Sequence, residues 1–292
     1  MYYPLTFAPI YKQMVWGSEK WVLSCRTNEM SVINNGTWAG KTLKEYITQN
    51  QEEILGTRFS SCEYFPILIK FINAEQALSV QVHPNDDYAK TKGETNGKSE
   101  VWYIKTPPTN GKLIVGLKPE TTKEQLLHAS KHGTVEKYLN MLNVKTGDIV
   151  DIPAGLVHAL TAGTKVLEVQ QNSDITYRLY DYNRYTRPLH INDALAVINF
   201  VNDFQEISKY WKCNIYKQII PNPNPIVVQS NHEAFSIITC VEGQVIIEAG
   251  LNFSIKMELE METEAVVFIP AKLGCYRIIP KSNKAVLIKI EP

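Results

Sequence analysis

Short stretches of β-branched and aromatic residues recur along most of the chain, separated by glycine, asparagine, proline and charged residues. Runs of this kind, bounded by turn-forming residues, are typical of β-strands. The clearest runs lie at residues 64–72, 99–104, 112–117, 147–155, 165–171, 175–182, 235–243, 244–250, 265–271 and 285–290. Many short strands at this spacing predict a mainly β protein, built as a sandwich or a jelly-roll barrel.

Helical periodicity is confined to a few regions of the chain. These are residues 41–55, 121–142 and 192–200. In the first region, Thr42 and Glu45 have the spacing of a capping box, which predicts a helix start. The second region reads as two short helices separated at Gly133, and it predicts a small helical insert at about 120–144.

A weak internal repeat indicates two β-barrel units of one kind. The stretch "DIPAGLVHAL" at 151–160 lines up with "FIPAKLGCYR" at 268–277, and an apolar strand follows each copy. Repeated segments in the same strand context favour a duplicated architecture. The predicted domains are residues 1–203 and 204–292. Since Cys275 stands opposite His158 in the alignment, we expect only the first copy to carry out chemistry.

One predicted strand end, "LSVQVHPND" at residues 78–86, carries an unusual polar face. Side chains alternate between the two faces of a strand, so Ser79, Gln81 and His83 point the same way. The apolar residues between them point the other way. A polar face inside a small barrel must be hydrogen-bonded or bind a ligand, and this face is therefore a candidate site.

Two further motifs extend this candidate site. In "GKSEVWYI" the same alternation places Lys98 and Glu100 on one face, and His158 follows the tight turn "IPAG". Together with Gln81 and His83, Glu100 and His158 offer an amide oxygen, a carboxylate and two imidazoles. Such a set can hold a divalent transition metal with positions left open. The alternative is structural, because a single histidine at a strand end is more often a structural residue than a ligand.

Composition narrows the class of function. The chain has 292 residues, and its 30 basic and 30 acidic residues give a net charge of zero. No excess positive charge is available for nucleic acid or an anionic membrane, so we expect neither as a partner. We also expect no signal peptide and no membrane span. The five cysteines are scattered without CxxC spacing, which predicts reduced, mostly buried thiols in a cytoplasmic protein.

At this point a resemblance to a known family is clear. The motifs "ALSVQVHPND", "GKSEVWYI", "IPAGLVHAL" and "LEVQQNSDITYRLYDYNR" resemble, in order, those of type I mannose-6-phosphate isomerases (phosphomannose isomerases) in their short bacterial form. The resemblance spans most of residues 5–200 and is weak beyond. It implies two cupin-type jelly-roll barrels, and interconversion of mannose 6-phosphate and fructose 6-phosphate. It also implies a zinc site with the ligands Gln81, His83, Glu100 and His158. Because the second unit lacks a matching ligand set, we expect one Zn²⁺ per chain.

The chemistry of an aldose–ketose isomerase points to further residues. A proton must move between C2 and C1 through a cis-enediol, which requires a base, a group that polarises the carbonyl and a holder for the phosphate. Glu168 is a carboxylate on an otherwise apolar strand, and Arg178 can bind phosphate or stabilise an oxyanion. The resemblance implies that Arg178 is the active-site arginine and that Lys98 and Ser79 lie near the sugar.

Some alternatives remain open on the sequence alone. The proton-transfer base is Glu168 or a metal-bound water, with Lys98 as the alternative, and Glu168 and Arg178 could instead form a structural ion pair. Two other functions compete: a sugar-phosphate-binding cupin without turnover, and a cupin oxygenase that uses Fe(II). We expect a small-molecule sugar phosphate as the ligand, and a monomer or a homodimer.

Overall fold

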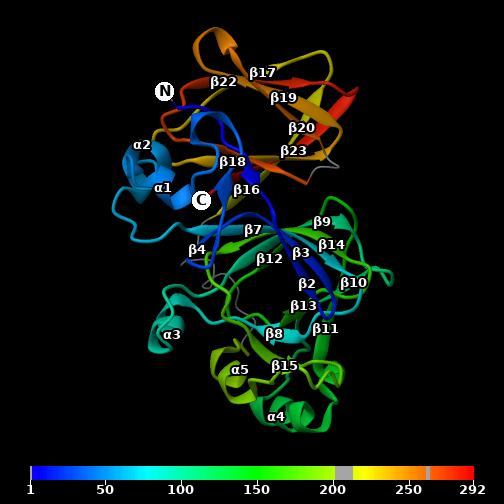
Figure 1. Cartoon of the computed structure of the whole chain (residues 1–292). Helices are drawn as coiled ribbons and strands as arrows, with labels where there is room; N and C mark the ends of the chain where they lie inside the picture. The colour runs from blue at the N-terminus through cyan, green and yellow to red at the C-terminus, as the bar shows by residue number, and fades with distance from the viewer. Residues whose placement is uncertain (1, 201–212, 261–263) are drawn as a thin grey trace. The chain divides into compact units, whose positions relative to one another are not determined.

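The computed structural model describes residues 2–200, 213–260 and 264–292 (Figure 1). The chain divides into two compact units. Residues 11–20 and 68–211 form one, here called the central unit, and residues 1–10, 21–67 and 212–292 form the other, the terminal unit. The predicted boundary between residues 203 and 204 lies outside the described residues, so the predicted domain division stays a prediction.

Strands predominate in the central unit. They are β2 (Ile10–Met14), β3 (Gly17–Leu23), β7 (Ile67–Ala74), β8 (Val80–Val82), β9 (Glu100–Thr106), β10 (Lys112–Leu117), β11 (Leu139–Asn143), β12 (Ile149–Ile152), β13 (His158–Ala159), β14 (Lys165–Gln171) and β15 (Tyr177–Tyr180). The helices of this unit are α3 (Asp86–Thr91), α4 (Lys123–His132), α5 (Ile191–Val197) and the 3₁₀ turn η3 (Val135–Tyr138). A mainly β protein was expected, and this is confirmed.

Two sheets of the central unit pack face to face. One has the strand order β11-β10-β13-β8-β15 and the other the order β12-β9-β14-β7-β3-β2. Their shared core contains Trp102 from β9 and Ile72 from β7, which cluster with Leu113 from β10. The strands therefore form two separate sheets around a common interior, and the described residues do not join them into a closed barrel.

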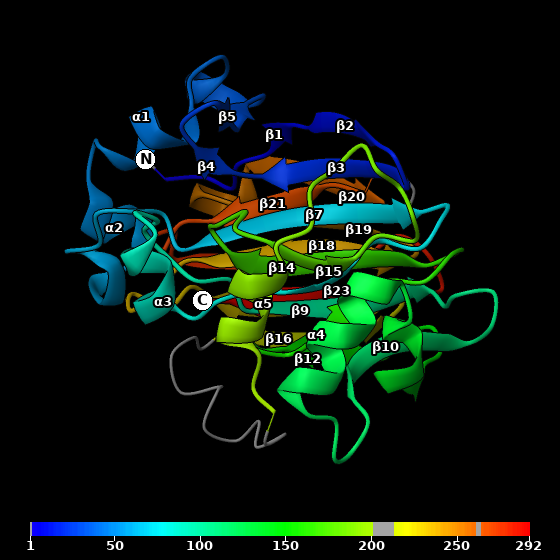
Figure 2. The same ribbon diagram turned by 90° about the horizontal axis from the view of Figure 1, so that it is seen from below.

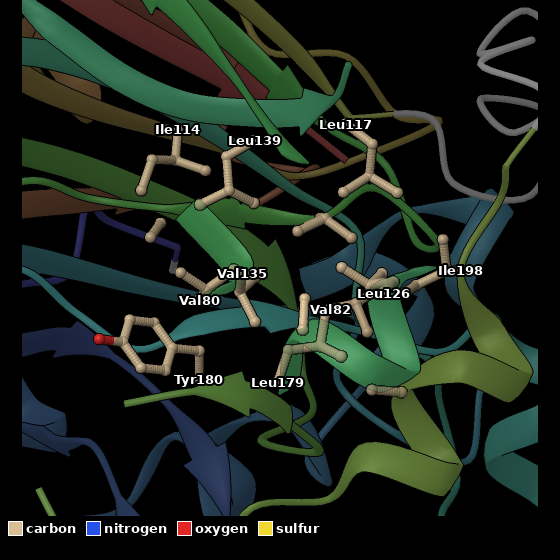
Figure 3. Close-up of a cluster of buried hydrophobic side chains, with 14 of the residues drawn as sticks. Val80, Val82, Ile114, Leu117, Leu126, Val135, Leu139, Leu179, Tyr180 and Ile198 are labelled. Atoms are coloured by element: carbon tan, nitrogen blue, oxygen red, sulfur yellow. The ribbon is translucent and has the colours of Figure 1, made fainter. Parts of the chain in front are cut away.

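Helices α4 and α5 cover the outer face of the five-stranded sheet, as the view from below shows (Figure 2). Val80 and Val82 of β8 cluster there with Leu126 of α4 and Ile198 just after α5 (Figure 3). Strand β8 is thus apolar toward the helices, while its polar side chains face the other way. This arrangement explains the strict alternation in "LSVQVHPND".

The strands of the terminal unit form two four-stranded sheets and two short ribbons. They are β1 (Phe7–Ala8), β4 (Cys25–Arg26), β5 (Glu29–Met30), β6 (Val32–Ile33), β16 (Asn214–Pro221), β17 (Ile226–Gln229), β18 (Ser236–Glu242), β19 (Gln244–Ala249), β20 (Ile255–Glu260), β21 (Val266–Ile269), β22 (Cys275–Pro280) and β23 (Lys284–Glu291). The sheets have the orders β16-β23-β18-β21 and β17-β22-β19-β20, and the ribbons pair β1 with β6 and β4 with β5. Every strand predicted from the hydrophobic pattern is present in one unit or the other.

An apolar cluster fills the terminal unit. Cys240 lies within it, beside Ile238 and Leu287. The expectation that the cysteines are mostly buried is wrong, since Cys240 alone is classed as buried and Cys275 is exposed at the start of β22. Residues near the N-terminus join this unit through reciprocal backbone hydrogen bonds between Leu5 and Phe268, of 2.9 and 2.8 Å.

The helix predictions need two corrections. The region 41–55 forms two helices, α1 (Leu43–Ile47) and α2 (Gln51–Leu55), because the side chain of Asn50 accepts from a backbone N–H and starts a second helix. The capping box of Thr42 and Glu45 is confirmed.

In the predicted insert, α4 ends at Gly133 as expected, with φ 67° and ψ 27°. The second half is not a helix. It forms η3 and then strand β11, in which Leu139 pairs with Leu117 of β10. Pairing with an exposed sheet edge satisfies the backbone of this stretch and overrides its weak helical periodicity.

Other elements of the terminal unit include two 3₁₀ turns before β7. They are η1 (Gly36–Trp38) and η2 (Thr57–Phe59). Phe65 follows the second turn and stacks on Phe235 at a centroid distance of 5.2 Å. Phe235 in turn stacks on Phe268 at 5.1 Å. These aromatic contacts explain why residues 57–65 group with the C-terminal sheets rather than with the central unit.

Candidate metal and active site

Three side chains of ligand type meet in the interior of the central unit. They are His83, Glu100 and His158, whose ligand atoms all lie within 4.8 Å of one another. Nε2 of His83 is 3.5 Å from one oxygen of Glu100, and Nε2 of His158 is 3.4 Å from the other. Each residue is only 1% exposed. Residues far apart in the sequence thus form one buried cluster.

The register of the strands explains how these side chains converge. His158 of β13 lies opposite Gln81 of β8, and Gln81 lies opposite Arg178 of β15. Directly opposite residues point to the same face of a sheet, so these three side chains form one row on the inner face. Glu100 comes from the first position of β9 in the facing sheet. The site therefore lies between the two sheets of the central unit.

Hydrogen bonds to the backbone orient both imidazoles. Nδ1 of His83 donates to the carbonyl of Ile175 at 2.9 Å, and Nδ1 of His158 donates to the carbonyl of Leu156 at 2.8 Å. A proton on Nδ1 leaves a lone pair on Nε2, which is the atom that faces Glu100. This is the usual arrangement of metal-binding histidines, in which the second ring nitrogen is held by an outer partner.

The protonation states suit a metal site as well. Burial, together with the charge of Lys98, lowers the pKa of His83 to about 3. Burial also lowers the pKa of His158. For Glu100, burial acts to raise the pKa, but Lys98 and the two imidazoles outweigh it and hold the pKa well below its usual range. Neutral imidazoles and an ionised carboxylate are the forms in which these groups bind a metal.

Gln81 lies beside the cluster with its amide in a defined position. Its Nε2 is 3.4 Å from Nε2 of His158, while its Oε1 accepts a hydrogen bond of 3.1 Å from the hydroxyl of Ser79. The amide nitrogen, and not the oxygen expected for a ligand, therefore faces His158. A half-turn of the amide exchanges these two atoms, so the position is compatible with an oxygen ligand.

A test of the fit comes from Glu100 itself. Both of its carboxylate oxygens are buried, and neither accepts a hydrogen bond from the described residues. Its charge is instead balanced by the ammonium of Lys98, whose Nζ lies 2.7 Å from Oε2. Lys98 therefore meets the need of this buried carboxylate for a cation, and the fit to a metal rests on the donor atoms. Two imidazole nitrogens and a carboxylate that converge within 4.8 Å are donors of the types that bind a divalent metal ion.

Glu168 belongs to a second buried group of charges. It is 4% exposed and accepts a hydrogen bond of 2.9 Å from the indole of Trp102. Its other oxygen lies 3.4 Å from Nζ of Lys70, and Lys70 lies 3.8 Å from Glu19. Burial and the nearby charge of Glu100 raise the pKa of Glu168. The ion-pair partner of Glu168 is thus Lys70.

The sequence reading missed Lys70 and Glu19. The available signal was a lysine inside the apolar run "PILIKFI". A lysine in such a run is expected to be buried with the strand, and a buried lysine needs a charged partner. In the structure Lys70 is buried in the middle of β7, and the carboxylates of Glu19 and Glu168 balance its charge. Glu19 stands in β3, in a stretch that looks like an ordinary surface strand.

Arg178 contributes a positive charge at the other end of the row. It is half-buried, and its Nε has no hydrogen-bond partner among the described residues. Burial lowers the pKa of its guanidinium, and the charge of Arg187 adds to this effect. Arg187 is itself bound to the buried carboxylate of Asp181, at 2.7 and 3.0 Å. The guanidinium groups of Arg178 and Arg187 therefore stand close enough to influence each other, and the carboxylate of Asp181 binds Arg187 and also Arg184.

Comparison with known proteins identifies the family. Residues 8–131 match the catalytic domain of type I phosphomannose isomerase. The chain is 38% identical over 221 residues to the probable mannose-6-phosphate isomerase GmuF of Bacillus subtilis (strain 168), covering 68% of this chain and 69% of the relative. It is also 38% identical over 218 residues to mannose-6-phosphate isomerase ManA of the same organism, covering 67% and 68%. The chain belongs to the type I phosphomannose isomerase family. The predicted family and enzyme class, a sugar-phosphate isomerase, are confirmed.

Solved structures of phosphomannose isomerases have the same fold. The crystal structure of mannose 6-phosphate isomerase from Bacillus subtilis superposes with a TM-score of 0.81 at 27% identity, over 98% of this chain and 99% of that one. A variant of phosphomannose isomerase from Salmonella typhimurium gives a TM-score of 0.75 at 15% identity over 99% of each chain, a likeness that concerns the fold alone. The predicted cupin-type fold of a phosphomannose isomerase is thereby confirmed. Over the described residues, no helix is long and apolar enough to cross a membrane.

Proposed function

We propose that this phosphomannose isomerase family member interconverts mannose 6-phosphate and fructose 6-phosphate in a metal-dependent reaction. The observation that carries the proposal is the buried cluster of His83, Glu100 and His158, in a chain whose relatives are named mannose-6-phosphate isomerases. We further propose that the enzyme acts in the cytoplasm on this small-molecule substrate. The sequence supports that location, since its five cysteines are scattered without CxxC spacing and cysteines of this kind are typical of reduced thiols in the cytoplasm.

The proposed metal ligands are Gln81, His83, Glu100 and His158, and the proposed metal is one Zn²⁺ per chain. Nitrogen and oxygen donors of this kind suit zinc, although they also suit Fe(II). When bound, the ion would polarise the carbonyl of the sugar and stabilise negative charge that develops on its oxygen. The chain's own contribution is to hold both imidazoles neutral and to keep Glu100 ionised, as described above.

The proposed proton carrier is Glu168, which would move a proton between C2 and C1 through a cis-enediol. A general base works best when its pKa lies near the working pH. Burial and the charge of Glu100 raise the pKa of Glu168 in that direction, and the hydrogen bond from Trp102 fixes one of its oxygens. Lys98 remains the alternative, because its ammonium lies 3.1 Å from Nε2 of His83.

The remaining predicted residues are proposed to bind the sugar phosphate. Arg178 has a buried Nε without a hydrogen-bond partner among the described residues, so it can engage a phosphate or an oxyanion. Ser79 and Lys98 lie on the same inner surface as the ligands, with the hydroxyl of Ser79 directed to Gln81. We propose that these two side chains contact the sugar hydroxyls.

One experiment tests this proposal against both alternatives. Conversion of fructose 6-phosphate to mannose 6-phosphate is measured for the purified protein, after chelation, and after zinc or Fe(II) is added back. Each sample is analysed for metal content. We expect activity that disappears on chelation and returns with zinc at one ion per chain. Binding of the sugar phosphate without turnover would favour the sugar-phosphate-binding cupin, and oxygen consumption with Fe(II) would favour the oxygenase.

A further inference from the structure

A hydrogen-bond network that the proposed chemistry does not use holds the segment before β9. Oδ1 of Asp86 accepts from the backbone N–H of Gly97 at 2.8 Å and from Nε2 of Gln171 at 2.9 Å. Oε1 of Gln171 accepts from the backbone N–H of Ser99 at 2.8 Å. Three bonds thus join the first residue of α3, the last residue of β14 and the segment 97–99.

This segment carries two of the residues proposed to act in the site. Lys98 lies between the two bonded N–H groups, and Glu100 follows directly. The N–H of Lys98 donates to the carbonyl of Pro84 at 3.0 Å, so three consecutive N–H groups are fixed. Since Pro84 follows His83, the network ties the backbone that carries one histidine to the backbone that carries the carboxylate.

The two backbones approach each other very closely at Gly97. A Cβ atom on this residue would lie 2.4 Å from the carbonyl carbon of Asn85 and 2.5 Å from the carbonyl oxygen of Pro84. A side chain of any size would therefore push the segments apart. Because Gly97 has no side chain, its backbone N–H can come within hydrogen-bond distance of Asp86. The carboxylate of Asp86 then accepts from this N–H and from the side chain of Gln171.

The third ligand is linked to the same network. The hydroxyl of Ser99 accepts from the N–H of Ala154 at 3.1 Å, and the N–H of Gly155 donates to the carbonyl of His83 at 2.8 Å. Both donors belong to the turn that leads into His158. The backbone segments that carry the three cluster residues are therefore bonded to one another outside the cluster itself.

We propose that Asp86 and Gln171 are positioning residues, which set the metal affinity of the site and the placement of Lys98 through the segment 97–99. The bonds described above join both side chains to this segment and to each other, and not to the cluster. This inference rests on the metal-binding part of the proposed function. Partners that orient metal ligands typically contribute about 10–100-fold to metal affinity or activity. The competing explanation is that the network contributes only to folding.

Zinc affinity of the metal-free protein separates these explanations. The dissociation constant is measured by competition with a chromophoric chelator, alongside the thermal midpoint of the metal-free protein. We expect Asp86→Ala to bind zinc about 10–100-fold more weakly. Its midpoint should stay close to that of the wild type, because Asp86 is half-exposed. At saturating zinc, KM for the sugar phosphate should still be raised, because the loss of the Asp86 bond displaces Lys98, a proposed contact of the sugar, even when the metal site is filled.

Three further variants sharpen the test. Asp86→Asn retains an acceptor oxygen at the same place and should restore most of the affinity. Gln171→Met preserves the shape of the side chain but removes both bonds, so it should weaken zinc binding as Asp86→Ala does. Asp87→Ala removes an exposed carboxylate from the same turn of α3 and should have no effect.

Wild-type zinc affinity in folded Asp86→Ala would overturn the proposal, as would an equal loss in Asp86→Asn and Asp86→Ala. If the expected affinity pattern appears in a protein that does not isomerise the sugar phosphate, then the substrate assignment fails and the positioning role stands. If the wild type isomerises and the variants bind zinc normally, then the positioning role alone fails. A wild-type protein that binds no zinc would overturn both.

Discussion

His158 is a single side chain on which both the proposed metal site and the proposed activity depend. Its imidazole is buried, and the hydrogen bond from Nδ1 to the carbonyl of Leu156 directs Nε2 toward Glu100. Its lowered pKa keeps the ring neutral, so Nε2 has a lone pair for the proposed metal. We expect His158→Ala, and equally His83→Ala, to lose both bound metal and isomerase activity. Metal analysis of the dialysed protein checks the loss. His132→Ala, which removes an exposed histidine from α4, is the control.

Stoichiometric metal in either variant would make the ligand assignment wrong. The circular dichroism spectrum should remain that of a β protein in both cases, because each substitution removes a polar group and not a packed apolar core residue.

Arg178 allows metal binding to be separated from chemistry. It lies on the same row as Gln81 and His158 but has no ligand-type atom. We therefore expect Arg178→Ala to keep its metal while kcat/KM falls by two or more decades, a loss of about 3 kcal/mol of transition-state stabilisation. Steady-state assays with fructose 6-phosphate and metal analysis of the same sample check this. Near-normal turnover would make Arg178 a structural residue.

At the scale of single residues, the sequence indicated the candidate site where polar side chains of metal-binding type follow the two-residue period of a strand. The alternation around Gln81 and His83, and again around Glu100, predicted one candidate site, and His83, Glu100 and His158 do form a cluster. The sequence could not indicate that Lys70 is the ion-pair partner of Glu168, because that contact joins two strands whose register depends on the whole sheet. It also could not indicate which atom of the Gln81 amide faces His158.

The end of helix α4 gives a test at the scale of one element. Gly133 has φ 67° and ψ 27°, a left-handed conformation that costs a residue with a Cβ about 1 kcal/mol or more. The nearest described atom lies 3.8 Å from the Cβ that alanine would add, so the cost is conformational and not steric. We expect Gly133→Ala to lower the free energy of unfolding by about 1 kcal/mol, measured by urea denaturation.

Gly133→Asn should recover part of this loss, since asparagine tolerates the left-handed region better than alanine. Lys131→Ala changes an exposed residue in the last turn of the same helix and serves as the control. Equal stability of Gly133→Ala and the wild type would contradict the argument from backbone conformation.

Element type followed from sequence wherever the hydrophobic pattern was strong. Strand β9, with its unbroken run of β-branched and aromatic residues, and strand β14, with its valines and leucine, were predicted at nearly their observed positions. The stretch that forms β11 was assigned to a helix, because its leucines also fit a helical period. Its observed pairing with β10 depends on an edge that only the assembled sheet presents. Strands as short as β13, with two residues, have no sequence signal of their own.

For the whole molecule, metal binding and stability should be coupled. The cluster residues lie far apart in the sequence and come together only in the folded chain, so the proposed metal should bind only the native state. We expect zinc at about 1,000 times its dissociation constant to stabilise the native state by about 4 kcal/mol. Thermal unfolding with and without chelator checks this. The shift should vanish in His158→Ala, and a shift that persists there would place the ion elsewhere.

The chain as a whole should hold one metal ion. Within the described residues, the cluster in the central unit is the only group of three or more histidine, cysteine or acidic side chains suited to a metal. In the terminal unit, Cys240 is packed in an apolar cluster and Cys275 is exposed. We expect dialysed protein to contain one zinc per chain, and Cys275→Ser to leave that content and the activity unchanged. Two ions per chain would contradict the assignment of a single metal site, in the central unit.

The order of the cluster residues along the chain has a consequence for biosynthesis. Gln81, His83 and Glu100 are made early, but His158 is made much later, and Arg178 pairs beside Gln81 only when β15 has been added. A nascent chain on the ribosome therefore cannot hold the ion until the residues after β13 have left the exit tunnel. With the proposed ligand set, metal loading would be a late event in the life of the polypeptide, and a cell short of the proposed metal would accumulate a chain that is fully synthesised but not yet active.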